Sequence, residues 1–500
     1  MRGEGVDVSE RRIAHARRRR AIVQKLTHIL STSAHCLEPR QRELAQGIGF
    51  RKPGLDSRVS VNGVRQSEEL VHGIARKGIF MNSIQRIVGL PLHLALSPCL
   101  DYSLPMPQLP LLRLKPREGR RVRAGAPWVF SNELALDAAA KALQPGSLVQ
   151  LEGDDGKALG VGYFNPQSLI AVRLFECPVE TKIDQTFLEA RLVRALALRE
   201  SLYDKPFYRL VQAEGDGLPG LTIDRFDRTL VVQITTAGME KLQEPLLAAL
   251  QKLIKPETIV LRADTPVRGL EGLETYVKAV EGEAPHHIAV EENGARYFAD
   301  LAGGQKTGWY YDQRDNRAFL APLAKNKSML DAYCYTGGFA IPAARAGAKE
   351  VSGIDSSAPA LQLAQDAAAA NGVDKICRFV KADVFEELER LSAKSERFDV
   401  VAADPPPFVK SRKDLEAGAK AYRKLARLAA SVTAPNGILF LASCSHNIPM
   451  ERFASECSIG IQRSGRRASL IRQAGAGPDH PSHPFLPETA YLKALVYALD

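Results

Sequence analysis

Cys444 stands where an apolar run ends, with a serine on each side, in the segment FLASCSHN at 440–447. A cysteine that only fills a core is expected inside such a run. α/β enzymes place reactive groups where strands give way to loops, and a thiolate there can act as a nucleophile. A thiolate that adds to carbon 6 of a pyrimidine makes carbon 5 able to accept a methyl group. Cys444 is therefore a candidate nucleophile, and the competing interpretation is a structural cysteine.

Four aspartates lie at or near the ends of four successive apolar runs: Asp331, Asp355, Asp383 and Asp404. The carboxyl ends of parallel strands share one edge of a sheet, so these acids are expected to line one crevice. The crevice has neither GxGxxG nor a GK[ST] loop. Its acidity favours a cofactor with a positive centre, S-adenosylmethionine, over NAD or ATP. The competing interpretation is that each aspartate only caps the next helix.

The predicted cofactor-binding residues come from this edge and from the segment just before it. The turn TGGF at 336–339 leads from the first run into a helix, and its glycines let a ligand approach the backbone closely. Asp355 follows at the spacing at which an acid bonds ribose hydroxyls. The full set is Asp331, Tyr333, Thr336, Gly337, Asp355, Asp383, Lys306 and Thr307.

The loop DPPPF at 404–408 bears on the kind of methylation. Methyltransferases that act on exocyclic amines use a loop of the form [DN]-P-P-aromatic, whose fourth residue stacks on the base. Here Pro407 is fourth and Phe408 is fifth, which argues against an amine methylator. Asp404 is expected to stabilise charge on the ring, and Pro405 and Phe408 to contact it. Two alternatives stay open: methylation of an amine or ring nitrogen with Cys444 structural, and an RNA-binding protein with an inactive methyltransferase fold.

The segment RLKPREGRRVR at 113–123 is a local basic patch followed by Trp128 and Phe130. Cations for phosphates beside aromatic rings for bases are typical of RNA binding, and the alternative is a solvated charged face. The predicted RNA-binding cations are Arg113, Lys115, Arg120 and Arg121. His480 and His483 have H-x-x-H spacing, but without further ligands nearby we expect no metal.

The elements that must position these residues divide the chain into four parts. Residues 1–105 lack a periodic apolar pattern, and we expect a disordered basic arm or, preferably, a true start at Met106. Short strand-like runs separated by turns predict a small β-barrel over 106–180. Mixed helix and strand patterns predict a small α/β linking domain over 181–285. Five apolar runs over 286–500, the first four each followed by a helical stretch, predict a doubly wound parallel sheet.

The composition of the chain further limits the kinds of protein that it can be. The net charge of +10 falls mostly within residues 1–105, so RNA binding must depend on a local patch. No apolar run reaches the roughly 18 residues of a membrane span. The seven cysteines form no C-x-x-C pair, which favours a reduced, cytoplasmic protein over a disulfide or zinc framework.

From about Leu111 to Asp500 the chain resembles the bacterial 23S ribosomal RNA cytosine-5 methyltransferases that carry an N-terminal PUA domain. The matching segments, in order, are KPREGRRVRAGAPWVFSNE, RLVQAEGDGLPGLTIDRF, LAGGQKTGWYYDQRDNR, LDAYCYTGGFAIPAA, DPPPFVKSR, ASCSH and DHPSHPFLPETAYLK.

This resemblance implies a PUA domain, a linking domain and a class I, Rossmann-like methyltransferase domain. It also implies S-adenosylmethionine as cofactor, large-subunit ribosomal RNA as partner, and Cys444 as the nucleophile. Related RNA cytosine-5 methyltransferases have a second cysteine after the strand-four acid, where this chain has Pro405 to Phe408. The base that removes the carbon 5 proton is therefore left open, as is a homodimer.

Overall fold

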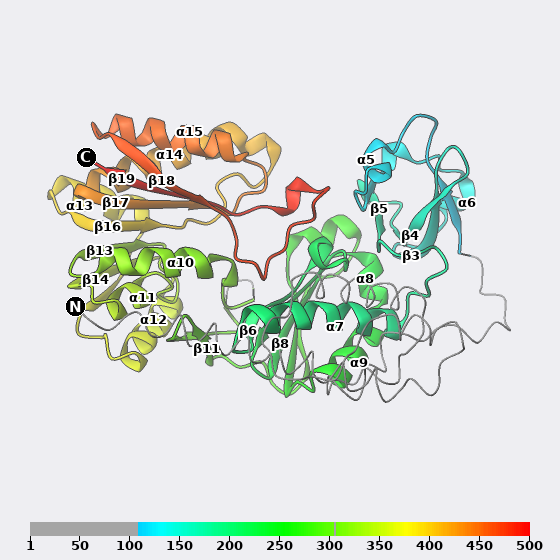
Figure 1. Ribbon diagram of the computed structural model, residues 1–500, viewed down its shortest axis with the longest axis horizontal. Helices are drawn as coiled ribbons and strands as arrows, with labels where there is room; N and C mark the ends of the chain where they lie inside the picture. Colours follow the sequence, from blue (N-terminus) through cyan, green and yellow to red (C-terminus); the bar gives the residue numbers. More distant parts are fainter. Residues whose placement is uncertain (1–108, 305–306) are drawn as a thin grey trace, which may run out of the picture. The chain divides into compact units, whose positions relative to one another are not determined.

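The computed structural model describes residues 109–304 and 307–500 (Figure 1). The expectations for residues 1–105 and for Lys306 lie outside the described residues. Within the described ranges, no helix is long and apolar enough to cross a membrane.

A seven-stranded sheet carries the four predicted acids, with strand order β15-β14-β13-β16-β17-β19-β18. Strands β13 to β17 run parallel, and β19 lies antiparallel between β17 and β18. The bounds are β13 (Ser328–Ala332), β14 (Glu350–Asp355), β15 (Cys377–Lys381), β16 (Phe398–Ala403), β17 (Thr433–Ser443), β18 (Ala468–Ala474) and β19 (Lys493–Leu499). The first five coincide with the five predicted runs, so the doubly wound sheet is confirmed, whereas β18 and β19 were not predicted.

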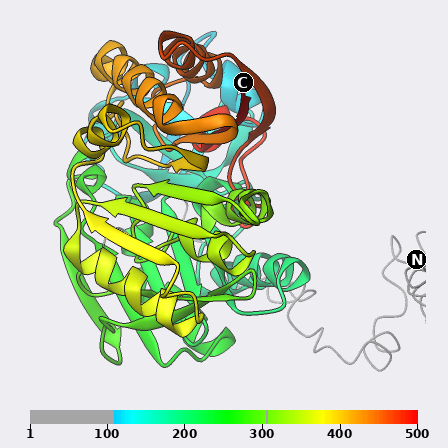
Figure 2. The same ribbon diagram turned by 90° about the vertical axis from the view of Figure 1, so that its left-hand side faces the viewer.

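Two groups of helices cover the two faces of this sheet (Figures 1 and 2). On one face lie α10 (Arg314–Leu320), α11 (Ala340–Arg345) and α12 (Ala358–Ala370), and on the other α13 (Val384–Ala393), α14 (Leu415–Val432) and α15 (Met450–Arg463). Helix α14 buries Tyr422, Leu425 and Ala429, three or four residues apart, as an amphipathic helix does. The central strands, such as β13 and β16, are covered on both faces and are nearly continuous apolar runs.

A five-stranded sheet lies N-terminal to these elements, in the order β1-β3-β4-β5-β2. Apolar side chains such as Val149 and Leu151 alternate toward its core, the period-two pattern of a sheet with one buried face. Its strands are β1 (Leu111–Arg113), β2 (Trp128–Phe130), β3 (Ser147–Glu152), β4 (Ala158–Phe164) and β5 (Ile170–Leu174), with short helices α5 (Arg120–Arg123) and α6 (Ala138–Lys141).

A second five-stranded sheet, β10-β9-β8-β7-β6, connects the two and packs against three helices. The elements are α7 (Gln185–Leu202), β6 (Phe207–Gln212), β7 (Leu221–Phe226), β8 (Thr229–Ile234), α8 (Ala237–Lys241), α9 (Gln243–Leu253), β9 (Thr258–Ala263) and β10 (Tyr276–Glu281). The hairpin of β11 (Ile288–Glu292) and β12 (Ala295–Ala299) follows. It turns at Asn293 and Gly294, both with positive φ, an Asn-Gly hairpin signal that the sequence analysis did not use.

Candidate active site

Cys444 and Asp404 leave the same edge of the sheet on neighbouring strands. Asp404 directly follows β16 and Cys444 directly follows β17, and in the parallel register Ala403 pairs with Leu441. Both residues are half-buried. Burial raises the pKa of Tyr310 well above its usual value, and the charges of Tyr335, Asp312, Asp404 and Cys444 add to the rise. The charges of the predicted nucleophile and of the predicted ring-stabilising acid therefore both influence the half-buried Tyr310.

The serines on either side of Cys444 anchor the strand end to α14. Ser443 Oγ donates to the hydroxyl of Tyr422 (2.7 Å), and the oxygens of Tyr422 and Ser445 lie 2.9 Å apart. The backbone N–H groups of Phe408 and Val409 donate to Tyr422 (3.4 Å) and Ser445 (3.3 Å). Because all three hydroxyls are buried and bonded, the network fixes both the Cys444 backbone and the DPPPF loop. Sequence analysis missed Tyr422, which comes 21 residues before Ser443.

The DPPPF loop folds its aromatic residue inward. The ring of Phe408 lies 4.8 Å from that of Tyr422 and 5.9 Å from that of Phe385, centroid to centroid. Pro405 is buried and Pro406 is exposed. The half-buried Phe408 ring thus packs against two aromatic rings of the protein.

The loop after β13 has an unusual backbone. Tyr333 (φ 64°), Tyr335 (φ 49°) and Gly337 (φ 83°) all adopt the left-handed conformation. Glycine does so without strain, but a bulky residue there is an outlier of the kind found at functional sites. Asp355 holds the loop, because its Oδ2 accepts from Tyr335 N (2.9 Å) while its Oδ1 accepts from Ser357 N (2.9 Å).

Asp331 and Thr336 carry buried polar atoms at the loop after β13. Asp331 Oδ2 accepts from the N–H groups of Phe339 (3.2 Å) and Ala340 (2.8 Å) at the start of α11, which is the capping role weighed above. Burial raises the pKa of Asp331 to about 7. Its Oδ1 and the Thr336 Oγ1 are buried and have no protein partner. Such atoms call for a polar ligand, so the residues fit a cofactor with an ammonium group and hydroxyls.

The remaining cofactor candidates differ in how they are placed. Asp383 is exposed and caps α13 by accepting from Glu386 N (3.1 Å). Thr307 is buried, and its Oγ1 lies 3.4 Å from the carbonyl oxygen of Trp309. Of the predicted set, five residues lie at the loop after β13, namely Asp331, Tyr333, Thr336, Gly337 and Asp355. Lys306 is outside the described residues.

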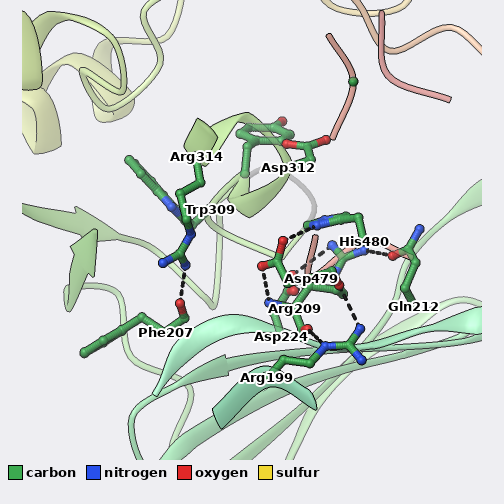
Figure 3. A network of polar contacts seen from close by, with 12 residues as sticks. Arg199, Phe207, Arg209, Gln212, Asp224, Trp309, Asp312, Arg314, Asp479 and His480 are labelled. Carbon is green, nitrogen blue, oxygen red and sulfur yellow. Dashed lines mark hydrogen bonds and ion pairs between the residues drawn. The ribbon is translucent and has the colours of Figure 1, made fainter. Parts of the chain in front are cut away.

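The segment from 475 to 492 is tied to the connecting sheet by a buried polar network (Figure 3). Arg199 bonds both carboxylate oxygens of Asp216 (2.6 and 2.8 Å) and the carbonyl of Asp479 (2.8 Å), and Arg209 N donates to Asp479 Oδ2 (3.0 Å). Burial opposes ionisation of Asp479, yet the charge and hydrogen bond of His480 hold its pKa below the usual value. Near the end of the segment, the hydroxyl of Tyr491 donates to Asp312 (2.7 Å). This network fixes the chain that enters β19 beside Cys444.

The histidines of this segment are structural pairs. His480 Nδ1 lies 2.8 Å from Asp479, and His483 Nε2 lies 2.9 Å from Glu176. In the described part of the chain, no group of three or more His, Cys, Asp or Glu side chains could hold a metal ion.

The cations of segment 113–123 are exposed and partly neutralised. Arg113 pairs with Glu152 (3.2 Å), Arg121 with Glu488 (2.9 Å), and Lys115 donates to the carbonyl of Asn132 (2.8 Å). Arg120 is exposed and lines a surface hollow of about 450 Å³ together with Arg117, Glu118, Arg123, Asp154 and Asp155. The nearby Trp128 is engaged too, since its Nε1 donates to Glu214 (2.8 Å). Basic side chains do cluster in this segment, but acidic side chains lie among its arginines.

Comparison with known proteins assigns these regions to families. Residues 112–176 match the family model of a PUA-like domain, and residues 273–497 match that of an S-adenosylmethionine-dependent methyltransferase. The chain is 36% identical over 374 residues to "Ribosomal RNA large subunit methyltransferase I" of Pseudoalteromonas atlantica, covering 74% of this chain and 94% of that protein. It is 37% identical over 390 residues to the protein of that name from Shewanella denitrificans, covering 77% and 98%.

Solved structures share the fold. SMU.776, crystallised in complex with SAH, has a TM-score of 0.68 and 21% identity, covering 78% of this chain and all of that one. At that identity the likeness concerns the fold alone.

The protein is an S-adenosylmethionine-dependent methyltransferase with a PUA-like domain followed by a Rossmann-like domain. It uses S-adenosylmethionine as its cofactor. More particularly, the chain belongs to the family of its curated relatives, the ribosomal RNA large subunit methyltransferases I.

Proposed function

We propose that this enzyme methylates carbon 5 of a cytosine in large-subunit ribosomal RNA through a covalent adduct on Cys444. The observation that carries the proposal is the position of Cys444, at the end of β17 and next to Asp404 at the end of β16, in the sheet of an S-adenosylmethionine-dependent methyltransferase. The names of the curated relatives support ribosomal RNA of the large subunit as the substrate.

In the proposed mechanism, the Cys444 thiolate attacks carbon 6 of the cytosine. The sulfur–carbon bond forms, the carbon 5–carbon 6 double bond opens, and carbon 5 becomes nucleophilic. S-adenosylmethionine supplies an electrophilic methyl group on its sulfonium. Loss of the carbon 5 proton to a base then restores the double bond and expels the thiolate. Asp404 stabilises charge that develops on the ring.

The other residues serve binding. Asp331, Thr336 and Asp355 are proposed to hold the cofactor, because two of them present unpartnered buried atoms and Asp355 stands at the end of the second strand. Pro405 is proposed to shape the base pocket. Arg120 and its neighbours in segment 113–123 are proposed to contact RNA phosphates.

Nucleoside analysis tests the proposal. Large-subunit ribosomal RNA from a strain that lacks the enzyme is incubated with the purified protein and methyl-labelled S-adenosylmethionine, then digested and resolved by mass spectrometry. The label is expected in 5-methylcytidine. Label in an N-methylated nucleoside instead would favour the amine or ring-nitrogen alternative, and no transfer to any ribosomal RNA would contradict the substrate assignment.

A further inference from the structure

Lys493 is a buried lysine whose neighbours include Ser443 and Ser445, the residues on either side of Cys444. It is the first residue of β19 and pairs with Ser443 in the antiparallel register. Only 5% of its surface is exposed. Its Nζ donates to the carbonyl oxygens of Ser445 (2.8 Å) and Tyr491 (2.7 Å). The ammonium group is thus bonded to the residue that follows Cys444 in the chain.

Burying this ammonium has an energetic cost that its hydrogen bonds alone do not offset. Charged lysines are rarely buried without a partner of opposite charge. In the described ranges, no carboxylate lies within ion-pair distance of Nζ, and both bonded partners are neutral carbonyls. Burial lowers the pKa of Lys493 to about 8, and the negative charge of Cys444 is the one influence that opposes the decrease. The thiolate of Cys444 is therefore the counter-charge that this site offers.

We propose that Lys493 is a positioning residue that keeps Cys444 in the thiolate form, its ammonium group being fixed beside the sulfur by the Ser445 and Tyr491 carbonyls. When the thiol ionises, its proton passes to solvent and Lys493 keeps its own proton. The thiolate is consumed when it bonds carbon 6 and is restored when that bond breaks, so Lys493 leaves the cycle unchanged. The inference rests on the proposed function only in taking Cys444 as the nucleophile.

Other titratable groups face the same thiol from the surrounding elements. Tyr310, Tyr422 and Tyr491 each have a pKa that burial raises above the usual value, so they stay neutral near pH 7. Asp404 at the end of β16 contributes negative charge, which opposes thiolate formation. His446 is exposed, its ring centroid lies 5.1 Å from that of Tyr491, and it needs its own control because histidine is ionisable. Among these described groups, Lys493 is the cation placed to favour the thiolate.

The pH dependence of thiol alkylation tests this without any RNA. The full chain is treated with iodoacetamide from pH 6 to 10, and the rate at each cysteine is followed by peptide mass spectrometry. Three variants separate charge from structure: Lys493→Gln keeps a donor without the charge, Lys493→Arg keeps the charge, and His446→Gln removes the neighbouring titration. Lys252→Met, at a lysine that pairs with Glu189 on the connecting domain, is the matched control. Cys177, half-buried with a pKa raised by burial, is the internal reference.

Lys493→Gln is expected to slow alkylation of Cys444 at pH 7 by about three- to tenfold and to move its midpoint to higher pH, since the thiolate fraction falls. The other three variants should keep the wild-type midpoint, and Cys177 should not respond. A folded Lys493→Gln protein with the wild-type profile would overturn the proposal. If that variant does not fold, the wild type decides, because a Cys444 midpoint at or above the usual value of about 8.5 also overturns it.

These outcomes are distinct from those for the proposed function. If Cys444→Ser retains full methyl transfer, the adduct mechanism fails whatever the alkylation shows. If Cys444→Ser is inactive while Lys493→Gln alkylates normally, the nucleophile stands and the role of Lys493 falls.

Discussion

The end of β17 and the basic segment 113–123 use polar side chains in opposite ways. Around Cys444, the hydroxyls of Ser443, Ser445 and Tyr422 are buried and bonded to one another. In the basic segment, exposed cations such as Arg113 and Arg121 pair with acids at the surface. Buried networks fix geometry, whereas exposed pairs contribute little and weaken as salt rises. The first region therefore suits the proposed reaction centre, and the second suits the proposed contacts with RNA phosphates.

Of the substitutions that test this comparison, one at Cys444 is expected to have the largest effect on activity. Cys444→Ser should reduce methyl transfer by at least roughly a thousandfold, because a hydroxyl is hardly ionised at neutral pH and is a poor nucleophile. Cofactor affinity by calorimetry and the thermal midpoint should stay close to wild type. Cys377→Ala, at a half-buried cysteine where β15 begins, is the control and should retain activity. An active Cys444→Ser enzyme would remove the basis for calling this region the reaction centre.

A smaller but still large effect, on cofactor affinity, is expected from a change at Asp355, where β14 ends at the same edge of the sheet as Cys444. Asp355→Asn should weaken S-adenosylmethionine binding by about 1.5–3 kcal/mol, the worth of a hydrogen bond to a charged group. The asparagine can still accept from one of the two backbone N–H groups that Asp355 now holds. Asp383→Asn, at the exposed cap of α13, is the matched control and should bind nearly normally. Equal affinity for all three proteins would show that Asp355 only shapes the loop.

The buried carboxyl group of Asp331 should also make the free energy of unfolding depend on pH. Burial raises the pKa of Asp331 from 3.8 to about 7 in the folded protein. The stability that its protonated form contributes is complete below pH 4 and is lost as the pH rises through 7. Asp331→Asn, which keeps an acceptor for α11, should thus be more stable than wild type at pH 8 by about 1–3 kcal/mol, with a smaller difference at pH 5. Thermal midpoints of the cofactor-free proteins measure this, and a difference independent of pH would contradict it.

The smallest effect is expected in segment 113–123. Arg120→Gln should weaken binding of a ribosomal RNA fragment only a few-fold at low salt and make the slope of log affinity against log salt shallower by about 1. The turnover number at saturating RNA should not change. Arg228→Gln, at an exposed arginine of the connecting domain that pairs with Glu257, is the control. A loss of turnover in Arg120→Gln would mean that the segment takes part in positioning the base.

Sequence alone predicts the methyltransferase sheet well for a physical reason. Strands buried on both faces are short continuous apolar runs. Strands β13 to β17 lie on the five apolar runs of the sequence, and the first four are each followed by a helix. Parallel topology then brings the strand ends to one edge, which is why Asp404 and Cys444 could be expected together. The edge strand β18, whose side chains are mostly exposed, lacks so clear a pattern, and no helical stretch of the kind that marks a parallel crossover identified β19. The residues that tie β6 to the 475–492 segment are far apart in sequence.

The parts of the site that depend on tertiary contacts were not predictable. Nothing in the run YLKALVYAL indicates that Lys493 is buried beside a cysteine 49 residues earlier. Two strand-end aspartates of the same type have different surroundings: Asp331 is buried with an unpartnered oxygen, while Asp383 is exposed and caps a helix. The S-C-S spacing around Cys444 did carry a signal, because hydroxyls flanking a strand end need partners once they are buried.

Trapping of the adduct tests the central claim most directly. In RNA whose target cytosine is replaced by 5-fluorocytosine, the fluorine cannot leave carbon 5 as the proton does, so the thioether to carbon 6 should persist. The account predicts a denaturant-stable complex of protein and RNA that forms only with S-adenosylmethionine, maps to Cys444 by mass spectrometry and is absent from Cys444→Ser. An enzyme that methylates unmodified RNA but forms no such complex, or forms it at another cysteine, would contradict the account.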